Sequence, residues 1–128
     1  MRNVILLIVL PVMFTACTTT LEEAYNAYPG KAKIVSIKIS PYNPTGKMEY
    51  CDIFFDFTPD DLSVREKYIY KKFPDKERQL FHDHRGNHKK KWVADTGIAV
   101  NKVYPAIRYE KKGGFGGAPV FFKVSVQP

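Results

Sequence analysis

Thiols are scarce in this sequence of 128 residues, which contains only two cysteines, Cys17 and Cys51. A disulfide within the chain would need both of them. If Cys17 serves another purpose, no such disulfide can form, and the stability of the fold must come from its packed core. Cys51 falls among apolar residues on the expected inward face of a strand, where a thiol is usually inert packing rather than a nucleophile.

The motifs of common enzyme classes are also missing. No serine lies in a nucleophile elbow, and the glycine-rich segment 111–119 lacks the Lys-Ser/Thr of a phosphate-binding loop. Asp52 and Asp56 share one face of an expected strand, but a spacing of four residues separates them by about 13 Å, which is too far for a glycosidase pair. We therefore predict that the chain is not an enzyme, and we expect no cofactor.

Long hydrophobic runs are absent, with one exception near the start of the chain. The run from Val4 to Phe14 follows Met1-Arg2-Asn3. It is too short to cross a bilayer, because a spanning helix needs about 20 apolar residues. A short cationic head, an apolar core and small residues after it are typical of a cleavable secretory signal.

The segment that closes this run, Phe14-Thr15-Ala16-Cys17, resembles the lipobox of bacterial lipoproteins. The resemblance implies that the Cys17 thiol is diacylated, for example with palmitate, that the chain is cleaved before Cys17, and that the new amine is acylated. It also implies an anchor in the outer membrane, because Thr18 stands where retention in the inner membrane usually involves Asp. We expect the domain to face the periplasm, and the cell exterior is the alternative. Residues 1–16 are then the signal peptide, 17–30 the lipid anchor with a short helix, and 31–128 a single domain.

The short helix is expected directly after the anchor. Thr20 and Glu23 have the spacing of a capping box, and Pro29-Gly30 would end the helix. One apolar stripe at helical spacing lies between them and consists of Leu21, Ala24, Tyr25 and Tyr28.

Three later segments have the period of two that is typical of strands with one buried face. The expected inward residues are Val35, Ile37 and Ile39 in the first; Cys51, Ile53, Phe55 and Phe57 in the second; and Val120, Phe122, Val124 and Val126 in the third. Further strands are expected at 78–83, 90–94 and 103–109, and one helical turn followed by a strand at 58–73. Short strands joined by Pro/Gly/Asn turns predict a mainly β fold, an antiparallel β-sandwich of the immunoglobulin-like kind or a small barrel.

Positive charge gathers in the second half of the sequence. Residues 17–66 hold 5 Lys/Arg against 8 Asp/Glu, a balance of −3, whereas residues 67–128 hold 14 against 5, a balance of +9. We expect several of these lysines to converge on one end of the domain, where they would meet anionic lipid head groups or an acidic envelope protein. A solvated lysine-rich surface is the alternative. Nucleic acid is not an expected partner of an exported protein. The candidate ligand-binding residues are Arg85, Lys89, Lys90, Lys91 and Trp92.

All three histidines lie close together, at His82, His84 and His88. A hairpin could bring their imidazoles around zinc or copper, although Arg85 and the neighbouring lysines would repel a cation. The main hypothesis is therefore a lipid-anchored, non-catalytic binding or accessory domain of the outer membrane, acting in envelope assembly, secretion or exclusion through its basic surface. The alternative is a periplasmic carrier of a metal or small ligand that uses the histidine hairpin.

Overall fold

The computed structural model describes residues 21–43, 46–81, 87–113 and 118–126. Cys17 and the segment around it lie outside the described residues. Two short α-helices, one 3-10 helix and six strands form the described part. In chain order they are α1 (Leu21–Ala24), β1 (Tyr25–Ile39), β2 (Tyr50–Pro59), η1 (Leu62–Lys67), β3 (Arg78–Gln79), β4 (Asn87–Lys89), α2 (Lys90–Thr96), β5 (Val103–Lys111) and β6 (Val120–Val124).

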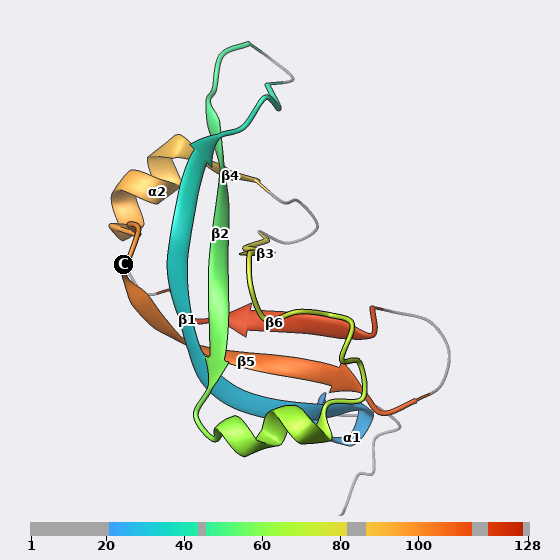
Figure 1. Cartoon of the computed structure of the whole chain (residues 1–128). Helices are drawn as coiled ribbons and strands as arrows, with labels where there is room; N and C mark the ends of the chain where they lie inside the picture. The colour runs from blue at the N-terminus through green and yellow to red at the C-terminus, as the bar shows by residue number, and fades with distance from the viewer. Residues whose placement is uncertain (1–20, 44–45, 82–86, 114–117, 127–128) are drawn as a thin grey trace, which may run out of the picture.

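The six strands form one antiparallel sheet that is bent into a half-barrel. Its order is β3-β2-β1-β5-β6, and β4 pairs with the other end of β2. The long strand β1 pairs with β5 through residues 25–33 and with β2 through residues 30–39. Because β1 bends between these two halves, β5 and β6 run across the direction of β2 (Figure 1). The bend lets a single sheet cover a core on its inner face.

The mainly β, antiparallel character predicted from the sequence is confirmed. The immunoglobulin-like sandwich is not seen, because the described strands belong to one sheet rather than to two packed sheets. The alternation of apolar residues shows that one face of each strand is buried. It does not show whether the cover comes from a second sheet or from the same sheet folded over.

A β-bulge in β1 changes which of its residues face inward. Ile34 pairs with Phe55 and Ser36 pairs with Phe54, so Val35 is the extra residue. Ile34 is completely buried, whereas Ile39 is 61% exposed. The prediction that Val35, Ile37 and Ile39 form the inward set is therefore wrong for Val35 and Ile39. A strict period of two cannot continue through a bulge.

The N-terminal helix is much shorter than predicted. It ends at Ala24, and Tyr25 to Gly30 pair with β5 as part of β1. Gly30 does not stop a helix but allows a close approach, because a Cβ there would collide with the backbone of Thr58 and Pro59. The hydrogen bonds gained with β5 outweigh a local helical pattern that has only two turns.

Two other segments also differ from the predictions. The helical turn expected near residue 60 is present as η1, with Asp61 accepting from the Ser63 amide at 3.0 Å, but residues 68–73 form no strand. Residues 90–96 form helix α2 instead of a strand, and Gly97 ends this helix with a left-handed φ of 70°. The five residues from Lys90 to Ala94 do not alternate between polar and apolar, and so short a segment does not distinguish a strand from a helix by its period.

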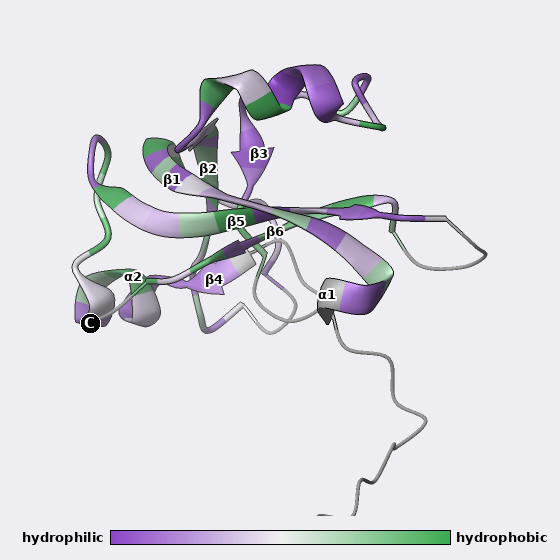
Figure 2. Cartoon of the chain, turned by 90° about the horizontal axis from the view of Figure 1, so that it is seen from below, coloured by the Kyte–Doolittle hydropathy of each residue, from purple (hydrophilic) through white to green (hydrophobic). Residues whose placement is uncertain are grey.

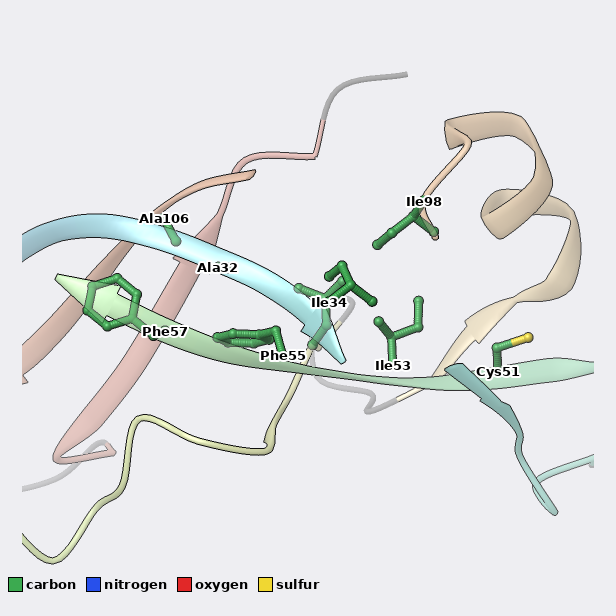
Figure 3. Packing of buried hydrophobic residues seen from close by; sticks show 9 residues of the cluster. Ala32, Ile34, Cys51, Ile53, Phe55, Phe57, Ile98 and Ala106 are labelled. Atoms are coloured by element: carbon green, nitrogen blue, oxygen red, sulfur yellow. The ribbon is translucent and has the colours of Figure 1, made fainter. Parts of the chain in front are cut away.

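The core lies on the inner face of the half-barrel. Cys51, Ile53, Phe55 and Phe57 of β2 form one buried cluster with Ala32 and Ile34 of β1, Ala106 of β5, and Ile98 (Figure 3). The predicted inward faces of β2 and β6 are thus confirmed, and Cys51 is buried as expected. Two side chains of α2, Trp92 and Val93, cover the end of the core next to Cys51 and Ile98.

Candidate functional site

The two ends of the molecule are far apart along β1 and carry different parts of the basic surface. In both views α1 and the last residues of β5 lie at one end, which we call the α1 end, and α2 lies at the other, the α2 end (Figures 1 and 2). The Lys112 amide donates to the Ala24 carbonyl at 3.0 Å, which ties β5 to α1. Tyr25 and Ile39 are separated by about 45 Å of strand.

The candidate lysines predicted as one ligand-binding set lie at the α2 end. Lys89 pairs with Tyr50 at the end of β2, and Lys90 and Lys91 begin α2. Lys90 contacts Glu49 at 3.0 Å and Lys91 contacts Asp95 at 2.8 Å, with all of these side chains more than half exposed. Such exposed pairs contribute about 0–1 kcal/mol each. Arg85, the fourth cationic member of the set, lies outside the described residues.

Trp92 does not form part of this lysine surface. It packs against the core, and its ring stacks on the His88 imidazole with centroids 4.3 Å apart. His88 is only 3% exposed, and its Nε2 lies 3.0 Å from the Leu80 carbonyl oxygen. Both rings therefore help to join β4 and α2 to the core.

The histidine hypothesis gains no support from this geometry. His82 and His84 lie outside the described residues, and His88 is buried beside Trp92. Among the described residues, no group of three or more His, Cys, Asp or Glu side chains could hold a metal ion.

The remaining lysines of the basic half gather at the α1 end. Lys111 pairs with Tyr25, and Lys112 follows it. Lys71 and Lys72 belong to a loop whose preceding residues bind the side chain of Glu110, the neighbour of Lys111. Several lysines thus lie near one end, but the length of β1 separates this group from Lys89, Lys90 and Lys91 at the other end.

A buried ionic network, which the sequence did not predict, holds this loop to β5. Arg108 and Glu110 of β5 are both completely buried. The guanidinium of Arg108 contacts Asp75 at 2.8 Å and Glu110 at 3.0 Å. It also donates to the carbonyl oxygens of Phe73 and Tyr70, each at 3.0 Å.

The two carboxylates of the network accept hydrogen bonds at all four of their oxygens. Glu110 accepts from the Ile69 amide at 3.0 Å and from the Tyr70 amide at 3.1 Å, as well as from Arg108. Asp75 accepts from Arg108 and, at 2.9 Å, from the Tyr68 hydroxyl. Satisfaction of every oxygen offsets much of the cost of removing these charges from water.

The ring of Tyr68 covers the guanidinium of Arg108. Its centroid lies 4.0 Å from the Arg108 guanidinium carbon, a cation–π contact. Burial, followed by the hydrogen bond to Asp75, raises the pKa of Tyr68. The hydroxyl therefore stays protonated and remains a donor at neutral pH.

This network has the properties of a structural clamp rather than a reactive site. Its charged groups are buried and paired. Among the described residues of this network, the one buried side-chain atom without a hydrogen-bond partner is Nε of Arg108. The sequence does contain a weak signal for it. Arg108 and Glu110 continue the inward-facing series of Tyr104 and Ala106, and opposite charges at inward positions of a strand indicate a buried pair.

Comparison with known proteins gives a negative result. No protein-family model, curated protein or solved structure matches this chain. Within the ranges that the structure describes, no helix is long and apolar enough to span a membrane. The functional argument therefore depends on the residues themselves.

Replacement of Arg108 by Met should strongly destabilise the fold. It would leave the buried carboxylates of Asp75 and Glu110 without their cation, and loss of one partner of a buried pair typically costs about 3–5 kcal/mol. The measurement is the free energy of unfolding in urea. Arg65→Met is the matched control, because Arg65 reaches the same Asp75 at 3.5 Å but is 46% exposed and should cost at most about 1 kcal/mol. Equal losses in the two variants would contradict a clamp centred on Arg108.

Proposed function

We propose that this protein is a lipid-anchored component of the bacterial outer membrane and that its half-barrel is a non-catalytic binding or accessory domain with the α1 end against the membrane. The lipobox-like sequence at Cys17 supplies the anchor. The observation that carries the orientation is that α1 begins at Leu21, only four positions after Cys17 in the sequence. Three threonines separate Leu21 from Cys17, so even a fully extended chain holds the two Cα atoms within about 14 Å of each other.

The side chains at the α1 end suit an anionic membrane surface. Lys71 and Lys72 are exposed. Among the residues that the structure describes, Lys71, Lys72 and Lys111 form no ion pair. Ile69, in the same loop, is 54% exposed. Each lysine near an anionic surface contributes about 1 kcal/mol to binding, so this group would support the acyl chains and orient the domain.

In this orientation the α2 end points away from the membrane. Lys90 and Lys91 already have the carboxylates of Glu49 and Asp95 as partners, which lowers the net charge that they present. The α2 end is therefore the weaker candidate for head-group binding, and an envelope protein is the partner expected on the side remote from the bilayer.

Replacement of Cys17 by Ser should remove the anchor. In cells given labelled palmitate, the wild-type chain should take up label and fractionate with the outer membrane. The Cys17→Ser variant should accumulate as unlabelled precursor, because no thiol remains at the processing site. Cys51→Ser is the matched control, since the buried Cys51 should not affect acylation. Uptake of palmitate by the Cys17→Ser variant would contradict the proposal.

The orientation can be tested with the lysines of the two ends. A chain that begins at Thr18 should bind anionic vesicles at low salt, and binding should weaken as salt shortens the screening length to about 8 Å. Changing Lys71, Lys72, Lys111 and Lys112 to Ser should reduce partitioning at least about tenfold. Changing Lys89, Lys90 and Lys91 should have a smaller effect. The reverse order in a vesicle sedimentation assay would place the α2 end, not the α1 end, at the membrane.

A further inference from the structure

The strand β6 has an open edge. Hydrogen bonds join Lys111 to Pro119 and Ser125 to Pro105, so Pro119 and Ser125 direct their backbone groups towards β5. By alternation, Phe121 and Lys123 between them do the same. In an antiparallel pair the alternate residues direct their amide and carbonyl groups to the other side. Val120, Phe122 and Val124 therefore direct theirs away from β5, and within the described segments no hydrogen bond is formed there. An unpaired strand edge is a template for one more strand.

A cation that forms no ion pair lies across from this edge. Arg78 of β3 is partly buried and pairs with the inward-facing Phe55. Its guanidinium carbon lies 5.6 Å from the centroid of the Phe122 ring and 6.0 Å from that of Phe73. Over the part of the chain that is described, Arg78 forms no hydrogen bond or ion pair. A partly buried guanidinium normally has a carboxylate or carbonyl partner, so this one is available to a ligand.

The free edge and the unpaired cation line the same groove. Arg78, Gln79 and Phe81 form one wall, and Ala118, Val120 and Phe122 form the other. Phe81 is 61% exposed there. The groove follows the opening of the half-barrel between β3 and β6, which are the two ends of the strand order.

We propose that this groove binds an extended segment of a partner protein, which adds as a strand to β6 and places a carboxylate side chain against Arg78. Strand addition supplies main-chain hydrogen bonds from Val120, Phe122 and Val124, and the alternate side chains of the segment meet the apolar wall. The carboxylate supplies the direct ion pair that Arg78 lacks. A second copy of the chain is a less suitable occupant than a single extended segment. An added strand must lie between β6 and β3, and a strand that belongs to a folded sheet carries its neighbouring strands with it. The proposal does not depend on the lipid anchor.

The probe is a fluorescent seven-residue peptide of alternating Thr and Val with one central Glu, titrated into the full chain in detergent micelles. Binding should be measurable by anisotropy. It should weaken roughly tenfold or more when the peptide Glu is replaced by Gln, or when Arg78 is replaced by Met, because a charge-assisted pair is lost. Arg65→Met is the control for the second change and should leave the affinity as it is.

Pairing at the edge is tested separately from charge. Val124→Pro removes an outward amide and should abolish binding. The variant should still fold, since proline is tolerated on an edge strand. Val124→Ala keeps the amide and should retain binding. A peptide with N-methylated amides should fail to bind the wild-type chain, and this arm needs no variant to fold. Absence of binding by the unmodified peptide, equal binding of the methylated peptide, or concentration-dependent dimerisation that excludes the peptide would each overturn the proposal.

Discussion

The contact of Arg108 with Asp75 and Glu110 is the constraint on which the described arrangement depends. Residues 60–77 connect β2 to β3 without forming a strand of their own, so they lack the ladder hydrogen bonds that fix the rest of the sheet. Glu110 supplies acceptors for two of their amides, and Arg108 supplies donors for two of their carbonyl oxygens. A loop of this length would otherwise retain much of its conformational entropy.

The same contact also determines where β3 lies. Besides binding Arg108, Asp75 accepts a hydrogen bond from the Phe57 amide through its carbonyl oxygen, at 2.7 Å. This bond fixes the chain against β2 three residues before Arg78. The unpaired guanidinium of Arg78 and its groove are thus positioned by the clamp. The lysines next to Tyr70 are positioned by it as well, so the proposed membrane surface and the proposed peptide groove share one structural support.

The sequence predicted those features that depend on local period. The inward faces of β2 and β6, the burial of Cys51 and the helical turn after Pro59 follow from spacing alone. The bulge at Val35 and the strand that replaced the helix at Tyr25 did not, because both depend on pairing with distant strands. The clamp joins Arg108 to Asp75 across 33 positions. No local pattern indicates which carboxylate an inward-facing arginine will meet.

Amide hydrogen exchange tests the clamp most directly, because Ile69 and Tyr70 donate to a buried carboxylate rather than to a strand. If the clamp is as described, these two amides should exchange as slowly as the amides that join β1 to β5. Lys71 and Lys72, the next residues of the loop, should exchange quickly, since they are exposed. Exchange of Ile69 and Tyr70 as fast as that of Lys71 and Lys72 would contradict the account.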